Sequence, residues 1–165
     1  MHYVRLLALA AIAAVTLGIV LSSSGSAQQP GERTLTFIER SNLGTFNLID
    51  NPPKSRGRGN NTRLSAGDMF VFRGPLFDAN NTQRVGQLGG TCTAVKGGRF
   101  ASAIFHCSAG MQLSDGTIEF QGPVTFGRTL RVAVVGGTQA YENARGSLTS
   151  TEGQRTSTDA VHLLP

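Results

Sequence analysis

The chain has 165 residues, of which 15 are Lys or Arg and 10 are Asp or Glu, giving a formal net charge of +5. The basic residues are scattered and are not interleaved with aromatic side chains, which argues against a nucleic-acid-binding surface. One basic cluster, residues 54–58, lies among prolines, glycines and asparagines. That composition is typical of a solvated loop; binding of an acidic polymer there is the alternative.

The first 27 residues have the pattern of a secretory signal peptide. A short charged start is followed by an apolar run over residues 6–21 and by small residues up to Ala27. The run is shorter than the ~20 residues that a membrane-spanning helix needs, so the pattern predicts cleavage and export rather than a membrane anchor. The remaining residues, 28–165, have the length of one domain.

The rest of the chain shows short runs of β-forming residues between glycines, prolines and asparagines, and no convincing helical periodicity. Eight strands are predicted, with a short extra piece at Phe46–Ile49. The eight are Leu35–Glu39, Asp68–Pro75, Gln83–Val95, Arg99–Ser108, Thr117–Gln121, Leu130–Val135, Gly146–Thr151 and Ala160–Leu164. Short links between them favour a closed up-and-down barrel, because closure removes exposed sheet edges. The longest gap, Asp50–Ala66, is expected to be a mobile loop.

Alternation within two of these strands indicates what the barrel encloses. The segment Met69–Phe72 is apolar on both faces, so we expect one face to line the lumen and the other to contact a second subunit. In residues 117–121, two apolar side chains share one face, and Glu119 and Gln121 share the other. The polar face is either the wet outer surface or part of a polar lumen. In the lumen, burial would raise the pKa of Glu119 and suit it to proton transfer.

Cys92 and Cys107 are the only cysteines in the chain. An even pair favours a disulfide in an exported protein, and a turn near Gly97–Gly98 would bring the two strands side by side. Closing a loop of about 15 residues would stabilise the fold by roughly 3 kcal/mol. The two histidines outside the signal, His106 and His162, have no metal-binding spacing, and no nucleophile elbow is present. No metal or cofactor is therefore expected.

The segment Val134–Gly146 places two glycines and a threonine after an apolar run. This order predicts a buried strand, a tight turn and a return strand, and it lacks the Gly-x-Gly-x-x-Gly spacing of a dinucleotide loop. Tyr141 is either a plug at the end of the barrel or a hydroxyl in the pocket. Arg145 either pairs with a carboxylate such as Asp68 or anchors an anionic or phenolic ligand.

Six segments occur in an order that is typical of one family. They are Gly67–Phe72, Pro75–Asp78, Arg84–Gly86, Gly89–Cys92, Gly116–Pro123 and Ala133–Thr138. Together they resemble the allene oxide cyclase family, and the last one, with Tyr141 and Ala144–Gly146, also resembles the dirigent proteins, which share the same barrel. The resemblance implies an all-β, eight-stranded antiparallel up-and-down β-barrel with a lipocalin-like lumen. It also implies a homotrimer that binds a hydrophobic or phenolic small molecule.

The resemblance to the plant cyclases carries over several pocket residues. Phe72, Phe100 and Cys92 match groups that line the pocket of those enzymes, and Glu39 is the candidate for their first-strand glutamate. Gly74 stands where that family has a water-holding asparagine, which is a departure from the pattern. A bridge at Cys92 would be a second departure, because it would leave no free thiol in the pocket.

Two classes of function follow from these observations. An isomerase or cyclase would hold an apolar substrate in a productive conformer and use Glu39 or Glu119 for proton transfer. A non-catalytic steering or carrier protein would need only apolar walls and a polar handle, such as Arg145, which stands where dirigent proteins place an arginine. A partly buried carboxylate facing the ligand distinguishes the first class from the second. The side chains assigned to ligand binding are Phe70, Phe72, Cys92, Phe100, Gln121, Tyr141 and Arg145.

Overall fold

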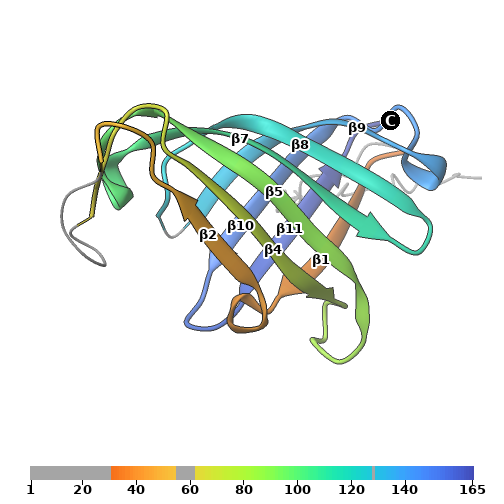
Figure 1. Cartoon of the computed structure of the whole chain (residues 1–165). Coiled ribbons are helices and arrows are strands. Elements are labelled where there is room, and N and C mark those ends of the chain that lie inside the picture. Colours follow the sequence, from red (N-terminus) through yellow and green to blue (C-terminus); the bar gives the residue numbers. More distant parts are fainter. Residues whose placement is uncertain (1–30, 55–61, 128) are drawn as a thin grey trace, which may run out of the picture.

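The computed structural model describes residues 31–54, 62–127 and 129–165 (Figure 1). The predicted signal peptide and most of the basic cluster lie outside the described residues. One sheet contains nine strands in the order β1-β11-β10-β9-β8-β7-β5-β4-β2, and an additional pairing of β1 with β4 closes it. Neighbouring strands pair in the antiparallel sense throughout. Because β1 and β2 both pair with β4 and count as one bent strand, the predicted all-β, eight-stranded antiparallel barrel is confirmed.

The strands differ greatly in length, from two residues to thirteen. They are β1 (Arg33–Glu39), β2 (Thr45–Ile49), β3 (Arg63–Leu64), β4 (Met69–Phe77), β5 (Arg84–Lys96), β6 (Gly98–Arg99), β7 (Ile104–Leu113), β8 (Gly116–Val124), β9 (Thr129–Gly137), β10 (Gly146–Glu152) and β11 (Ser157–Leu163). Three short 3-10 helices complete the described elements: η1 (Ser41–Leu43), η3 (Phe100–Ser102) and η4 (Gln139–Tyr141). Within the described ranges, no helix is long and apolar enough to cross a membrane.

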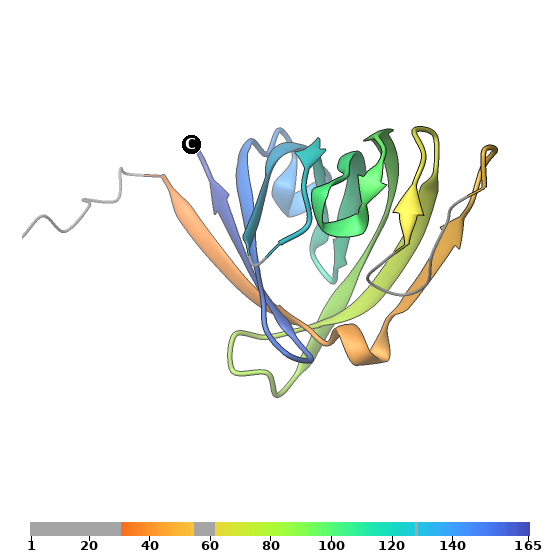
Figure 2. The same ribbon diagram turned by 90° about the vertical axis from the view of Figure 1, so that its left-hand side faces the viewer.

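The strands β1 and β2 together act as the first strand of the barrel. Both pair antiparallel with β4, Glu39 opposite Leu76 and Thr45 opposite Arg73. The 3-10 helix η1 lies between them at the bottom of a bend from which the two strands diverge (Figure 2). On its other edge β1 pairs with β11 along its whole length. The predicted extra piece at 46–49 is thus the second half of a bent strand.

Most predicted strand positions agree with the structure to within a few residues, but the segment Arg99–Ser108 does not. The chain forms η3 there, and β7 begins only at Ile104 and runs on to Leu113. Gly110 does not end this strand but lies inside it, opposite Glu119. An ideal Cβ at this position would lie 2.8 Å from the Glu119 carboxylate oxygens. The glycine therefore makes room for a cross-strand side chain.

Two apolar clusters fill the interior. The larger one draws on nearly every long strand and includes Leu76, Met111, Ile118 and Val161. The second cluster contains Phe70, Phe105 and the Cys92–Cys107 disulfide and packs against Phe100 of η3. The two cysteines lie directly opposite each other on β5 and β7, so the predicted disulfide is confirmed. It joins the two strands with the most extensive mutual pairing.

Candidate functional site

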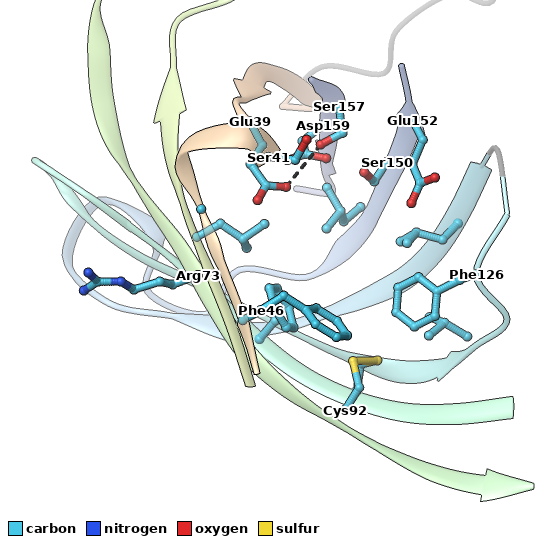
Figure 3. A pocket seen from close by; sticks show the side chains of 18 of the residues that line it. Glu39, Ser41, Phe46, Arg73, Cys92, Phe126, Ser150, Glu152, Ser157 and Asp159 are labelled. Atoms are coloured by element: carbon cyan, nitrogen blue, oxygen red, sulfur yellow. Dashed lines mark hydrogen bonds between the residues drawn. A yellow bond between two sulfur atoms is a disulfide. The ribbon is translucent and has the colours of Figure 1, made fainter. Parts of the chain in front are cut away.

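A cavity of about 470 Å³ lies inside the barrel. Its apolar lining includes Phe46, Phe70, Phe72, Leu88, Cys92, Ala109, Phe120, Val124, Phe126 and Val132. Its polar lining includes Glu39, Ser150, Glu152, Ser157 and Asp159. Figure 3 shows the labelled carboxylates on one side of this space and Phe46, Phe126 and Cys92 on the other. The cavity thus has an aromatic wall and an acidic wall.

The acidic wall is built by strand alternation on β1, β11 and β10. Every second residue of β11 is buried, starting from Ser157 and Asp159. Register places Ser157 between Glu39 of β1 and Glu152 of β10. It places Asp159 beside Ser150 of β10 in the next inward row. Because side chains two residues apart share a face, five polar groups meet at one end of an otherwise apolar stripe.

Glu39 is held against β4 and β11. The Ser157 hydroxyl donates a hydrogen bond to Glu39 Oε2 at 3.1 Å, and the other carboxylate oxygen lies where a Cβ at Gly74 would be. Burial raises the pKa of Glu39, and the charges of Asp159 and Glu152 raise it further, while the Ser157 bond partly offsets the rise. The absence of a side chain at Gly74 is thus what lets the carboxylate occupy this place.

Asp159 is the most deeply buried polar group of the wall, with 1% of its surface exposed. Burial raises its pKa from 3.8 to about 6, although a hydrogen bond from Ser150 acts in the opposite direction. Its Oδ2 atom has no hydrogen-bond partner. Buried polar atoms are almost always paired in folded proteins, so this oxygen marks an incomplete site.

The aromatic wall is a stack of rings that continues into the second apolar cluster. The rings of Phe46 and Phe70 stack with their centroids 4.6 Å apart, and that of Phe126 lies 5.3 Å from Phe70. Phe46 is 54% exposed, and neighbouring rim residues such as Thr45 and Gln154 are also exposed. The rim therefore marks the open side of the cavity.

The structure brings four of the predicted site residues together: Glu39, Phe70, Phe72 and Cys92 all line the cavity. Phe100 lies behind this wall, with its ring centroid 5.0 Å from that of Phe126 and 6.0 Å from that of Phe70. Cys92 is bonded to Cys107 and therefore offers no thiol. The first-strand glutamate indicated by the resemblance is thus placed facing the cavity.

Glu119 and Gln121 are not part of the cavity. Both are exposed, whereas Ile118 and Phe120 between and beside them are buried in the core. The interpretation of this polar face as a polar lumen is corrected accordingly, because the pleat of β8 turns the apolar pair inward and the polar pair to solvent. The alternative reading, a wet outer face, is the one that the structure shows.

Tyr141 and Arg145 also lie away from the cavity. The Tyr141 hydroxyl donates to both carboxylate oxygens of Asp115, at 3.0 and 3.1 Å, and its ring packs in the larger apolar cluster. Burial and the Asp115 carboxylate raise the pKa of Tyr141. The exposed Arg145 donates to the carbonyl of Pro165, and Asp68 instead accepts bonds from the backbone of Asn51 and Ser65. A plug is therefore the role that the position of Tyr141 supports.

Several cavity residues were absent from the sequence-based set: Phe46, Phe126, Ser150, Glu152, Ser157 and Asp159. A signal for the last two was present. The residues Ser157, Asp159, Val161 and Leu163 alternate with exposed or half-buried residues in one continuous strand, but the predicted strand began at Ala160 and excluded the polar start of this stripe. Among the described residues, no group of three or more His, Cys, Asp or Glu side chains could hold a metal ion.

A hydrophobic cavity with a pair of carboxyl groups withdrawn from solvent can orient an apolar molecule and exchange a proton with it.

Three similar solved structures share the fold. They are a pyocyanin demethylase (20% identical, TM-score 0.63, covering 80% of this chain and 100% of that one), a pterocarpan synthase dirigent protein (18%, 0.58, 80% and 92%) and an exo-specific intermolecular Diels-Alderase (15%, 0.56, 80% and 97%). No curated protein matches the chain.

A family model described as "Dirigent-like protein" matches residues 37–164. That range includes every strand of the barrel except part of β1, and it contains both walls of the cavity. The finer resemblance to allene oxide cyclases stays a prediction, since the matching family is the dirigent-like one. Because the family model matches most of the chain, the chain belongs to the dirigent-like protein family.

Proposed function

We propose that this dirigent-like protein is exported, binds a small hydrophobic molecule in its cavity and directs the isomerisation or ring closure of that molecule. The observation that carries the proposal is the combination of an aromatic wall with the half-buried Glu39 and the buried Asp159 in one cavity. A carrier would need the first feature but not the second. Withdrawing two neighbouring carboxyl groups from water costs stability, which a purely apolar container would avoid.

The aromatic wall would fix the conformation of the substrate. Holding reacting groups in a near-attack arrangement can contribute roughly 7–11 kcal/mol to lowering a barrier, which suits an intramolecular ring closure. Phe46, Phe70 and Phe126 offer flat surfaces at the open side of the cavity and toward its interior. The substrate body would lie against these rings, with its polar end toward β11.

The carboxyl pair would move the proton. Asp159, with a pKa of about 6, is matched to proton transfer near neutral pH, and Glu39 shares the same wall. In an isomerisation, one carboxylate would take a proton from one atom of the substrate, and the resulting carboxylic acid would return it to another. The step is redox-neutral and needs no co-reactant.

A non-catalytic steering or carrier function is the second candidate. It is favoured by the large apolar share of the lining and by the position of Tyr141 and Arg145 outside the cavity, which leaves no cationic handle from those residues. In that case the carboxylates would only orient a polar end of the ligand. Export is supported in both cases by the disulfide, because such bonds persist in oxidising compartments.

Binding can be tested with the neutral dye Nile red and a pair of matched variants. Val132 lines the cavity, whereas its neighbour Ala133 on β9 is exposed on the opposite face. We expect saturable binding of one dye per chain, loss of binding in Val132→Trp, and unchanged binding in Ala133→Trp. If both variants bind like the unmodified protein, the dye does not occupy the cavity and the proposal fails.

Proton transfer can be tested with a simple bound ketone, 2-tetralone, by following hydrogen–deuterium exchange next to its carbonyl by NMR. The cyclase-like function predicts exchange faster than in buffer alone and loss of the acceleration in Glu39→Gln or Asp159→Asn. The control is Glu119→Gln, which removes one carboxylate from the outer face. Binding of the ketone without any accelerated exchange would favour the steering or carrier function.

We also propose, from the family resemblance, that the chain acts as a homo-oligomer, a trimer in the first instance. Two large apolar side chains, Ile49 and Val71, lie exposed on the outer face of β2 and β4. Their exposure supports the expectation that the outer face of Met69–Phe72 contacts a second subunit. Light scattering of the mature protein tests this directly, and a monomeric mass at micromolar concentration would contradict it.

A further inference from the structure

The polar atoms of the cavity are acidic, although the chain as a whole is basic. The net charge is +5, yet three of the ten acidic residues, Glu39, Glu152 and Asp159, line this one space. The described part of the lining contains one basic residue, Arg73. Figure 3 shows the Arg73 side chain pointing away from the carboxylates. The cavity therefore has a local charge opposite in sign to that of the molecule.

We propose that the natural ligand is a flat aromatic or heteroaromatic molecule that carries a protonated nitrogen, and that this cation binds to the carboxylates of Glu39 and Asp159. The inference deepens the proposed function, since it rests on the cavity being the ligand site. It names the chemical class of the ligand and the wall of the cavity that recognises its charge.

The carboxylates of the acidic wall are incompletely paired. Buried carboxylates in folded proteins are paired with a cation or fully hydrogen-bonded. Ser157 supplies one bond to Glu39, but Asp159 Oδ2 has no partner and 1% of Asp159 is exposed. A ligand with an N–H⁺ group would supply the positive charge and the donor that this oxygen lacks. The described residues offer no group of three metal-ligating side chains here, so a metal ion would lack a complete set of protein ligands.

The wall that faces the carboxylates is aromatic. Phe46, Phe70 and Phe126 all line the same cavity, and their rings pack against one another. Aromatic rings favour offset or edge contacts with other aromatic rings and attract cations over their faces. A flat aromatic cation would satisfy both walls at once. An aliphatic carboxylate such as a fatty acid would place its charge against three acidic residues.

The rival mode is a protonated Asp159 that donates a hydrogen bond to a neutral carbonyl ligand. The two modes have opposite pH dependence. The polar groups that share the acidic wall with Asp159 are Glu39 from β1, Glu152 from β10 and the hydroxyls of Ser150 and Ser157; none of these is basic. As the pH falls through about 6 and Asp159 becomes neutral, a cationic ligand loses affinity, whereas a neutral carbonyl ligand gains it.

The test uses three probes with the same ring system: 9-(aminomethyl)anthracene, 9-anthracenemethanol and anthracene-9-carboxylate, which are cationic, neutral and anionic. Binding to the full protein is followed by anthracene fluorescence anisotropy. We expect the cation to bind at least about tenfold more tightly than the alcohol near pH 8, a difference of about 1.4 kcal/mol, and the anion to bind more weakly than either. The preference should shrink as the pH falls below about 6.

The variants decide whether the carboxylates cause this preference. Asp159→Asn and Glu39→Gln should each reduce the affinity of the cation about tenfold or more while leaving that of the alcohol within about threefold. Glu119→Gln, which removes the same charge from the outer face, should leave all three affinities unchanged. The pH titration of the unmodified protein gives the answer even if a variant does not fold.

The outcomes separate this inference from the proposed function. Equal binding of the three probes would overturn the inference that the ligand is a cation, and so would an affinity for the alcohol that rises as the pH falls. Either result would leave the cavity as a binding site. Failure of all three probes and of Nile red to bind would overturn both. A preference for the cation that persists in Asp159→Asn and Glu39→Gln would also overturn the inference, because the carboxylates would not be its cause.

Discussion

At the scale of single residues, Asp159 is a buried carboxyl group whose ionisation costs the fold stability. Its carboxyl is buried and lacks one hydrogen-bond partner. A pKa of about 6 in the folded chain, compared with 3.8 for an ordinary aspartate, means that ionising it is harder in the folded than in the unfolded state. Such a cost is common where function requires a perturbed acid.

Replacing Asp159 with Asn should therefore stabilise the fold at alkaline pH. Between about pH 4 and 6 the folded chain binds more protons at this position than the unfolded chain, so its contribution to the free energy of unfolding falls as the pH rises. An asparagine side chain cannot ionise and avoids that loss. We expect a gain of up to about 3 kcal/mol near pH 8 that vanishes near pH 4, measured by urea denaturation with Glu119→Gln as the control. A loss of stability at alkaline pH would contradict the assigned burial.

Gly74 is the second residue whose role can be tested alone. A methyl group at this position would meet the Glu39 carboxylate, which can move because it ends a flexible side chain. Gly74→Ala should thus lower the free energy of unfolding by about 1 kcal/mol and displace Glu39 from Ser157. The matched control is Gly136→Ala in β9, where a Cβ has open space. In a background that already carries Glu39→Ala, Gly74→Ala should no longer lower the free energy of unfolding. If the effects of the two substitutions on that free energy simply add, the two positions are not coupled.

At the scale of elements, the pairing of strands determines which residues meet in the cavity. The bend at η1 lets β1 pair with β11 while β2 continues along β4. As a result, the strands of the acidic wall (β1, β10 and β11) and the phenylalanine-bearing strands β2 and β4 line the same cavity. The disulfide joins β5 to β7 at directly opposite positions in the same lining. Both features depend on the register of strand pairing. A slip of one residue would turn the side chains of the shifted strand to the opposite face of the sheet.

Reducing the Cys92–Cys107 bond should destabilise the barrel by roughly 3 kcal/mol, as expected for a closed loop of about 15 residues. The midpoint of urea denaturation should fall on addition of a reductant in the unmodified protein and should not respond to reductant in Cys92→Ala with Cys107→Ala. Two reactive thiols in the untreated, folded protein would contradict the bridge.

The elements also show how far the sequence alone determines this structure. Period-two alternation was enough to predict most of the strands and to place Ile118 and Phe120 on one face, because one buried face imposes that pattern. It left open whether the opposite face, with Glu119 and Gln121, is the outer surface or the lumen. It did not predict the acidic wall. The polar Ser157 and Asp159 open β11 and look like loop residues, and their meeting with Glu39 depends on pairing between strands more than a hundred residues apart. Local patterns do not contain that information.

At the scale of the whole molecule, a basic chain encloses an acidic cavity in a dirigent-like barrel. The similar structures share the fold at 15–20% identity, and the barrel therefore supplies a container whose chemistry depends on the side chains that line it. In this chain those side chains are a stack of phenylalanines and a group of carboxylates. The central claim is that this cavity binds the ligand.

The most direct measurement of that claim uses tryptophan fluorescence, because the chain contains no tryptophan. In Phe126→Trp the single indole would report from the cavity wall, and in Ala133→Trp it would report from the outer face. Titration with 9-(aminomethyl)anthracene should quench the emission of the first variant by energy transfer, saturably and with one probe per chain. It should do so only weakly once Asp159 is also replaced by Asn. The absence of saturable quenching in Phe126→Trp would contradict the account.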